Sequence, residues 1–336
     1  MIFNVWVTRK CNLKCTYCYE GLQKPDTKLE RNVALEIIEF VERYTKERKE
    51  SSISINFHGG EPLIAFDTIQ YIANEINRRF KTVKVNYGLT TNGTLLNDEI
   101  IESLSKMMPY GLSISIDGNK QIHDTNRKFS NGQGSYEVIE KNLKKIVSKI
   151  PDCRARSTYN HNTITHLSES VIHLIDQGFK TVVAAGDYYD SLWEDSDEDI
   201  LRREISKLAE YYKTLPNKNE IRINLLDKTL IQYSPCQGGI TSINIDVDGK
   251  IYPCIVAVGN SEYEIGSVSS GIDTKKVNNI LDFGTEMHEE CKECPINECC
   301  NGVRCKLKHQ IISGNCLNIP AFLCIEKNAI YDSIES

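Results

Sequence analysis

The chain has 336 residues, a formal net charge of -6 and 40% hydrophobic residues, so we expect one larger and one smaller folded domain. No stretch approaches the roughly 20 consecutive apolar residues of a membrane helix, and the N-terminus lacks a signal-peptide pattern. We therefore expect a cytoplasmic protein with no membrane partner. The acidic balance and the lack of a long basic run argue against nucleic acid and favour a small-molecule or peptide substrate.

Short apolar runs alternate with amphipathic stretches, which predicts a series of strand and helix pairs. The expected strands are residues 3–8, 53–57, 83–89, 112–116, 154–159 and 181–185. The expected helices are residues 30–48, 69–80, 98–106, 136–150, 167–177 and 200–213. Six such units predict an α/β fold with a parallel sheet, which right-handed crossovers curl toward a barrel. The pattern alone leaves a partial barrel, a full barrel and an open sheet as alternatives.

Polar motifs directly follow the first four predicted strands. They are residues 11–18, 59–62, 91–94 and 117–118. In barrel-like folds, sites are built from the loops at the carboxyl ends of parallel strands. We therefore expect these four loops to form one site.

The first of these loops carries Cys11, Cys15 and Cys18 at spacing Cx3Cx2C. Three thiolates on one loop can bind three irons of a [4Fe–4S] cluster, which has four irons to be ligated. One iron is then left open for chemistry. A zinc site is the alternative, although structural zinc normally takes two CxxC-type pairs.

The thirteen cysteines fall into two groups, three at the front and nine between Cys236 and Cys324, with Cys153 alone between them. In a cytosolic chain of enzyme size, such cysteines are more often metal ligands than disulfide partners. Two metal-bearing regions are therefore predicted. Cys153, which precedes a predicted strand, is interpreted as an ordinary buried thiol.

Two motifs resemble those of the radical S-adenosylmethionine (SAM) superfamily over residues 1–186. They are the Cx3Cx2C loop with the aromatic Tyr17 before its last cysteine, and His58-Gly-Gly-Glu-Pro after the second strand. The resemblance implies a partial (β/α)6 TIM-like barrel. It also implies that SAM binds the open iron and is cleaved reductively to a 5′-deoxyadenosyl radical. An iron–sulfur electron carrier without catalysis is an alternative, but a carrier has no need of the Gly-Gly-Glu-Pro motif.

The resemblance also implies a set of residues that bind SAM. Gly59 and Gly60 allow the backbone to approach its methionyl end, Glu61 accepts from its ammonium group, and Tyr17 lies beside the adenine. Ser115 and Arg156 match positions that contact SAM through a hydroxyl and a guanidinium, although Arg154 leaves the arginine register open. A further family pattern comprises His123, Asp124 and Arg127, for which structural roles are an alternative.

The C-terminal cysteines resemble the SPASM extension of radical SAM enzymes, which carries auxiliary iron–sulfur clusters. A hairpin is predicted around Asp248-Gly249, between Cys236 and Cys254. By resemblance, a distal cluster is bound by Cys291, Cys294, Cys300 and Cys324, and a proximal cluster by Cys236, Cys254 and Cys305. Cys299 and Cys316 are unassigned, and either could complete the proximal cluster; otherwise it has an open iron. A zinc ribbon is the alternative.

Three domains are therefore expected: a radical SAM partial barrel at residues 1–186, a bridging helical region at 187–229, and a SPASM-like domain at 230–336. An acidic and aromatic run lies at residues 187–199. We interpret it as a solvated linker that leads into the next helix. A surface that receives a basic peptide is the alternative.

The motifs favour a peptide-modifying radical SAM maturase that forms a sulfur-to-carbon thioether crosslink in a ribosomally made, cysteine-containing precursor. The alternative is an anaerobic sulfatase-maturating enzyme, which makes formylglycine. Those enzymes resemble this chain but typically carry an Asp after the hairpin cysteine and a Gln before Gly-Gly-Glu-Pro, where Ile255 and His58 stand here. The expected redox partner is a reductant such as ferredoxin or flavodoxin. Because the first strand starts at once, leader recognition is expected from a separate leader-peptide-binding protein, from the tail domain or from the substrate core itself.

Overall fold

The computed structural model describes residues 1–22, 25–227, 236–281, 289–297, 300 and 305–335. The chain divides into two compact units. The first unit comprises Met1–Lys14, Glu20–Ser113 and Gln237–Asp282. The second unit comprises Cys15–Tyr19, Ile114–Cys236 and Phe283–Ser336. The domain boundaries expected from the sequence stay a prediction.

The sheet of the first unit has three parallel strands at its centre. They are β1 (Ile2–Thr8), β2 (Ser52–Gly59) and β3 (Lys84–Thr91). On the other side of β1 lies β8 (Ser242–Ile245), also parallel. Antiparallel pairing continues the sheet through β9 (Lys250–Tyr252), β10 (Gly266–Ser267) and β11 (Gly271–Ile272). The C-terminal hairpin thus covers an edge of β1 that would otherwise be open to pairing with another chain.

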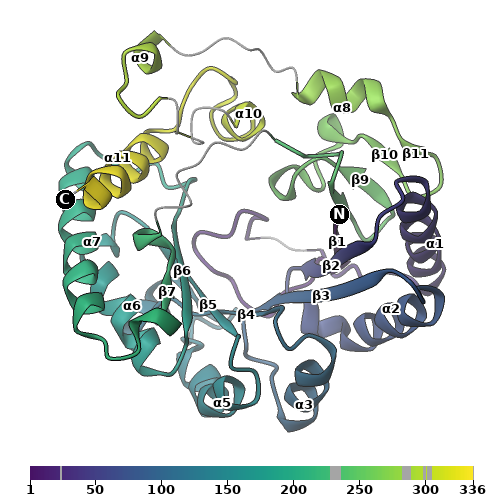
Figure 1. The fold of residues 1–336 in the computed structure, drawn as a ribbon, viewed down its shortest axis with the longest axis horizontal. Helices are drawn as coiled ribbons and strands as arrows, with labels where there is room; N and C mark the ends of the chain where they lie inside the picture. The colour runs from purple at the N-terminus through teal and green to yellow at the C-terminus, as the bar shows by residue number, and fades with distance from the viewer. Residues whose placement is uncertain (23–24, 228–235, 282–288, 298–299, 301–304, 336) are drawn as a thin grey trace. The chain divides into compact units, whose positions relative to one another are not determined.

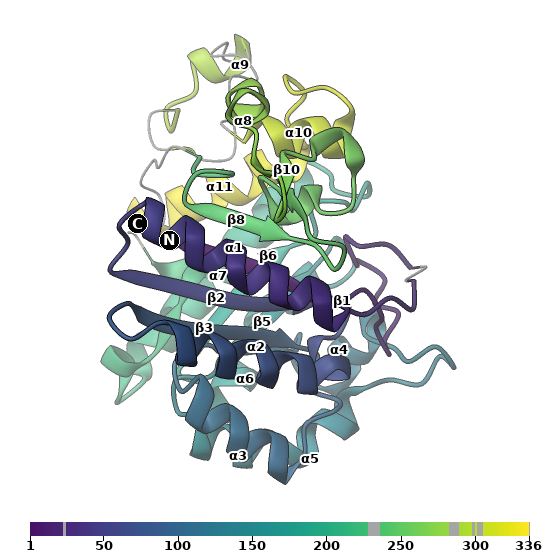
Figure 2. The same ribbon diagram turned by 90° about the vertical axis from the view of Figure 1, so that its right-hand side faces the viewer.

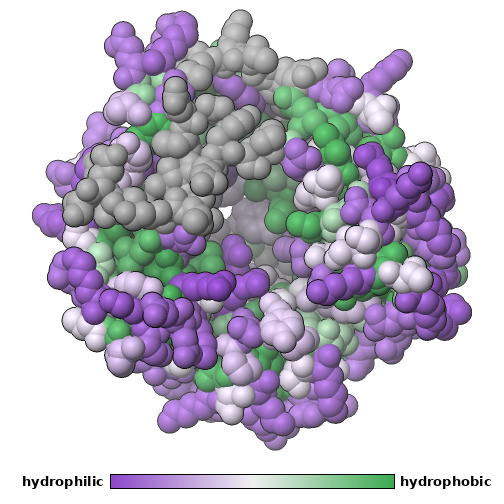
Figure 3. All heavy atoms as spheres, viewed as in Figure 1, coloured by the Kyte–Doolittle hydropathy of each residue, from purple (hydrophilic) through white to green (hydrophobic). Residues whose placement is uncertain are grey.

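Helices cover one face of this sheet, where α1 (Arg31–Glu47) and α2 (Phe66–Arg79) lie side by side (Figures 1 and 2). Phe3 of β1 packs edge-on against Phe40 and Tyr44 of α1, which places the odd-numbered residues of β1 on the helix-covered face. The side of the unit on which α1 and α2 lie is largely hydrophilic on its surface (Figure 3). The remaining helices are α3 (Asp98–Met107) and α8 (Thr274–Leu281).

The second unit repeats the parallel arrangement with β5 (Arg154–Tyr159), β6 (Thr181–Gly186) and β7 (Arg222–Ile223). Strand β4 (Leu112–Ser115) contains the division between the units. The helices are α4 (Lys120–Asn126), α5 (Tyr136–Lys149), α6 (Leu167–Asp176), α7 (Ser196–Thr214), α9 (Glu289–Lys292), α10 (Lys306–Ser313) and α11 (Ala321–Glu335). No helix among the residues described is long and apolar enough to cross a membrane.

All six predicted strands and all six predicted helices are present, with ends that differ by at most a few residues. The predicted hairpin is also confirmed: Gly249 has φ 80°, a conformation that favours glycine, between β8 and β9. The acidic run leads into α7, where Asp197, Glu198 and Asp199 occupy the first turn and complement the helix dipole. Helices α4 and α8 to α11 were not predicted from the sequence.

A ladder of amides crosses the face of the sheet opposite α1, with Asn4 and Asn244 buried and Asn56 half-buried. Asn244, Asn4 and Asn56 are in register on β8, β1 and β2. Asn4 donates to Asn244 Oδ1 at 2.8 Å and accepts from Asn56 Nδ2 at 3.0 Å, while Asn244 Nδ2 donates to the Tyr252 carbonyl. A Cβ on the in-register Gly88 would lie 2.3 Å from Asn56 Oδ1. The ladder therefore fixes the register of three strands and requires a glycine on the fourth.

Replacement of Asn4 by Ala should lower the free energy of unfolding by about 2–4 kcal/mol, because Asn244 and Asn56 each lose a partner and each such loss costs about 1–3 kcal/mol. Urea denaturation followed by circular dichroism measures the effect. The exposed Asn86 on β3 supplies the control, and Asn86→Ala should change stability by less than about 0.5 kcal/mol. Equal effects of the two variants would contradict a specific role of the ladder.

Candidate functional site

Cys11 lies in the loop after β1, within the first unit. Its sulfur accepts from the Leu13 backbone N–H at 3.4 Å and from Asn92 Nδ2 at 3.9 Å, a distance suited to the larger sulfur atom. Asn92 is 7% exposed and follows β3. It also donates to Asn12 Oδ1, and its own Oδ1 accepts from Thr94. The loops after β1 and β3 are therefore joined through one amide that reaches a cysteine sulfur.

Glu61 is a buried anion of this unit, with 1% of its surface exposed. Its Oε1 accepts from Leu63 N at 3.0 Å and from Thr91 Oγ1 at 2.6 Å, and its Oε2 accepts from Asn92 N at 2.7 Å. The carboxylate thus connects the loop after β2 to the loop after β3. The sequence predicted an acceptor for the SAM ammonium; three internal donors already use much of its capacity.

Gly59 and Gly60 are required by the neighbouring backbone of the first unit. A Cβ on Gly59 would lie 2.2 Å from the Thr8 carbonyl oxygen, and one on Gly60 would lie 2.4 Å from that of Lys10. In addition, Gly60 N donates to the Thr8 carbonyl, and Glu61 N donates to that of Lys10. The two glycines therefore bring the motif against the start of the cysteine loop, whether or not they also approach SAM.

In the second unit, Cys15 and Cys18 form a tight turn, in which Cys18 N donates to the Cys15 carbonyl at 3.2 Å. Between them, Thr16 bonds to Asn126 at the end of α4 through both its backbone N–H and its hydroxyl. Asn126 is 3% exposed, and its Nδ2 is buried without a hydrogen-bond partner among the described residues. Such an unpaired donor beside the cysteine turn is compatible with a bound ligand.

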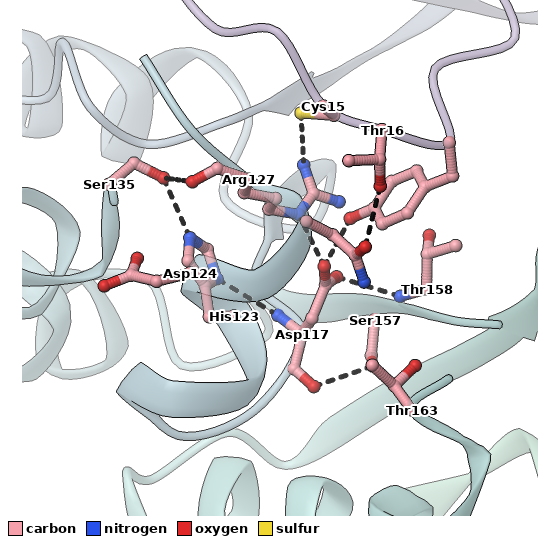
Figure 4. Close-up of polar contacts among 12 residues, drawn as sticks. Cys15, Thr16, Asp117, His123, Asp124, Arg127, Ser135, Ser157, Thr158 and Thr163 are labelled. Carbon is pink, nitrogen blue, oxygen red and sulfur yellow. Dashed lines mark hydrogen bonds and ion pairs between the residues drawn. The ribbon is translucent and has the colours of Figure 1, made fainter. Parts of the chain in front are cut away.

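Asp117, directly after β4, is the centre of the polar contacts in Figure 4. Its Oδ1 accepts from Thr158 N at 2.9 Å, and its Oδ2 accepts from Arg127 Nε at 3.1 Å and from the Tyr17 hydroxyl. Arg127 also directs Nη1 at Cys15 Sγ, 3.9 Å away, and its guanidinium lies 5.2 Å from the centre of the Tyr17 ring. Burial raises the pKa of Tyr17 well above its usual value, so this hydroxyl stays a donor.

His123 and Asp124 stabilise the backbone around this cluster. His123 Nδ1 accepts from Asp117 N, so Nε2 carries the proton and donates to Ser135 Oγ, which in turn donates to the Arg127 carbonyl. Burial lowers the pKa of His123 well below its usual value, which keeps the ring neutral. Asp124 accepts from Tyr136 N at the start of α5. These contacts favour the structural role for His123 and Asp124.

Ser115 and Arg156 lie on neighbouring strands of the second unit. Ser115 is the half-buried last residue of β4. Arg154 and Arg156 share one exposed face of β5, two residues apart, and Arg156 is nearer the carboxyl end of the strand, where Thr158 contacts Asp117. This position favours Arg156 over Arg154 as the residue near the site.

Most of the described C-terminal cysteines lie in irregular segments, whereas Cys291 lies in α9 and Cys324 in α11. Cys254 precedes a 3-10 turn in the first unit, whereas the other described members of the group lie in the second unit. These are Cys236, Cys291, Cys294, Cys300, Cys305, Cys316 and Cys324. Burial raises the pKa of Cys305, and Cys236 lies close enough to raise it further. Cys299 lies outside the described residues.

The donor chemistry of the cysteine loop fits a [4Fe–4S] cluster. Among the described residues, no three His, Cys, Asp or Glu side chains converge as the ligands of a single metal ion do. A cubane differs, because each cysteine binds a separate iron. The sulfur atoms of Cys11 and Cys15 receive N–H donors, as cluster ligands do, whereas Cys153 is a buried thiol whose pKa burial raises.

The fold and site define the class of protein: an α/β enzyme with a large, mostly parallel sheet and a cysteine loop at the end of its first strand. Residues 6–178 match the Radical SAM superfamily. The chain belongs to this superfamily and is a radical SAM enzyme, with S-adenosylmethionine and [4Fe–4S] clusters as its cofactors.

Similar proteins cover nearly the whole chain. A cysteine-type anaerobic sulfatase-maturating enzyme of Clostridium perfringens is 24% identical, over 87% of this chain and 85% of its own length. The solved structure of native anSMEcpe with bound AdoMet and Cp18Cys peptide has a TM-score of 0.80 at 22% identity, covering 99% of this chain and 96% of that one. Streptococcus suis SuiB bound to precursor peptide SuiA has a TM-score of 0.66 at 17% identity, covering 96% and 75%. These structures establish the barrel-like fold.

The sequence alone did not identify the two residues that donate directly to a cysteine sulfur. Each of them also bonds to a buried carboxylate. Asn92 stands in a motif that was noted only as a strand-end loop, and Arg127 stood in a pattern without an assigned role. Asp117 was noted for its place after the fourth strand but not as an acceptor. A polar residue directly after a buried parallel strand was the available signal.

Replacement of Glu61 by Gln should lower the free energy of unfolding by about 1–3 kcal/mol, because an amide N–H₂ then faces buried donors and leaves one unsatisfied. Thermal and urea unfolding of the full chain measure the change. Glu36 is exposed on α1, and Glu36→Gln should be neutral within about 0.5 kcal/mol. A Glu61→Gln protein as stable as this control would argue that the carboxylate is free to serve a ligand.

Proposed function

We propose that this radical SAM enzyme is a maturase of a ribosomally made, cysteine-containing peptide, in which it forms a sulfur-to-carbon thioether crosslink. The observation that carries the maturase assignment is similarity over 99% of the chain to a radical SAM enzyme solved with both AdoMet and a peptide bound. A second enzyme of this fold, SuiB, was solved with its precursor peptide. An extended peptide is therefore a substrate class that this fold accepts.

Cys11, Cys15 and Cys18 would hold the SAM-binding cluster, and Tyr17, Gly59, Gly60, Glu61, Ser115 and Arg156 would bind SAM. When bound, the cluster supplies the electron that cleaves SAM to a 5′-deoxyadenosyl radical, which abstracts hydrogen from the peptide. Glu61 and Asp117 hold their loops in place, so that the donors on those loops are positioned before SAM arrives. Arg156, exposed on β5, provides a cation for the carboxylate of SAM.

We further propose that the C-terminal cysteines form a SPASM-like domain with auxiliary clusters. The residues that would hold auxiliary clusters are Cys236, Cys254, Cys291, Cys294, Cys300, Cys305 and Cys324. Cys316 is a further candidate, because its carbonyl accepts from the buried His309, which follows Cys305 on α10.

Thioether formation needs a substrate thiolate held near the carbon to be attacked. A cluster with an open iron would bind that thiolate and lower the pKa of the thiol. In the overall reaction the peptide loses one C–H hydrogen and one S–H proton as a C–S bond forms. The hydrogen atom enters 5′-deoxyadenosine, the proton enters solvent, and the electron released balances the one that cleaves SAM.

Formylglycine formation is the second candidate, favoured by the similarity to sulfatase-maturating enzymes of Clostridium perfringens and Klebsiella pneumoniae. Oxidation of a peptide cysteine to an aldehyde needs a proton acceptor near the reacting carbon. The residue after Cys254 is Ile255, whose side chain cannot accept a proton. This observation favours the thioether over formylglycine.

The product separates these chemistries. The anaerobically reconstituted protein is incubated with SAM, dithionite and a cysteine-containing peptide encoded beside its gene, and the peptide is analysed by mass spectrometry. We expect a peptide lighter by two hydrogens with a blocked thiol, and about twelve irons per chain for three cubanes. A peptide that has lost the cysteine sulfur and gained an aldehyde would instead establish formylglycine formation. Failure to cleave SAM would reject both reactions.

Individual cysteines should separate SAM cleavage from product formation. Cys15→Ala should abolish 5′-deoxyadenosine formation, because the SAM-binding cluster loses a ligand. Cys254→Ala should retain some SAM cleavage but lose the peptide product. Cys153→Ala, which alters a buried thiol outside the site, should retain both activities. Complete loss of SAM cleavage in a folded Cys254→Ala protein would contradict this division of roles.

A further inference from the structure

Arg127 connects a buried anion to a cysteine sulfur in the second unit (Figure 4). Its side chain extends from the end of α4, with Nε 3.1 Å from Asp117 Oδ2 and Nη1 3.9 Å from Cys15 Sγ. Only 7% of Arg127 and 1% of Asp117 is exposed. A guanidinium presents its N–H groups in a rigid fork, so one face can serve the carboxylate while another N–H serves the sulfur.

The buried guanidinium stays charged. Arginine keeps its proton in proteins, and the Asp117 carboxylate accepts a hydrogen bond from the guanidinium. The Tyr17 ring, 5.2 Å away, adds a favourable cation–π contact. Cys15 therefore has a cationic hydrogen-bond donor.

We propose that Arg127 is a positioning residue that sets the reduction potential of the cluster held by Cys15, and that the Asp117 carboxylate shifts this potential in the opposite direction. The proposal rests on the proposed role of the Cx3Cx2C loop. A hydrogen bond to a ligand sulfur and a nearby positive charge both stabilise the additional electron of a reduced cluster. In a buried site these effects are weakly screened by solvent.

The two members of the pair should act with opposite signs. Arg127→Gln removes the cation and leaves the Asp117 carboxylate near the cluster, so the cluster should become harder to reduce. Asp117→Asn removes the anion and leaves the cation, so the cluster should become easier to reduce. A general loosening of the fold gives no reason for the reduction potential to shift in opposite directions. The two variants together therefore test the effect of charge and not only that of packing.

The experiment is a potentiometric titration with dithionite of the reconstituted full chain, in which the SAM-sensitive part of the electron paramagnetic resonance signal reports the cluster. We expect a change of at least tenfold in the one-electron reduction equilibrium, or about 59 mV, downward for Arg127→Gln and upward for Asp117→Asn. Lys120 is exposed on the same helix, and Lys120→Gln should leave the potential unchanged. Unchanged potentials in both site variants, or shifts in the same direction, would overturn the proposal.

A buried carboxylate without its cation is destabilising, so a double variant keeps the test decisive if Arg127→Gln does not fold. Asp117→Asn/Arg127→Gln carries neither charge. Its cluster should be at least tenfold harder to reduce than that of Asp117→Asn alone, and equal potentials would overturn the proposal. A wild-type protein whose cluster signal does not respond to SAM would instead reject the proposed function, independently of Arg127.

Discussion

A carboxylate buried at the end of a parallel strand holds the loops of each compact unit together. A backbone N–H beyond the end of its strand, or one that faces past the end of a shorter neighbouring strand, has no ladder partner, and burial makes an unpaired N–H costly. Glu61 accepts from Asn92 N and Asp117 accepts from Thr158 N, each with two further donors. The anions are in turn tolerated in the interior because these donors replace water.

The same carboxylates connect to the cysteine loop through one further side chain. In the first unit Asn92 bonds to Glu61 and reaches Cys11, and in the second unit Arg127 bonds to Asp117 and reaches Cys15. The donors differ in charge, because an amide is neutral and a guanidinium is cationic. Two sulfur atoms on one short loop thus receive different electrostatic environments, although each is set by an anion after a neighbouring strand.

Local pattern predicted much of the fold but little of its long-range pairing. The six strands and their helices follow from hydrophobic period, and the hairpin follows from Asp248-Gly249, since both signals lie within a few residues of the element itself. The pairing of β8 with β1 joins Asn244 to Asn4, 240 residues apart, and no local pattern encodes such a partner. For the same reason, the amide ladder could not be predicted from the sequence.

The residue types of the site were predictable, but their partners were not. By resemblance, the motifs identified Glu61 as an acceptor for the SAM ammonium and Tyr17 as a ring beside the adenine of SAM. The structure supplies internal donors for the first and gives the second a bond to Asp117. A carboxylate in a sequence has the same lone pairs whether a ligand or a backbone N–H will fill them. The fold determines which donor bonds to the carboxylate.

The pairing of β1 with β8 also has a consequence for synthesis on the ribosome. β1 is made long before one of its two neighbours, Ser242–Ile245. Until then one edge of β1 presents unpaired N–H and C=O groups, which favour aggregation. Late closure of so distant a contact also slows folding. The nascent chain therefore carries an open edge on β1, beside its first three cysteines, until β8 has been made.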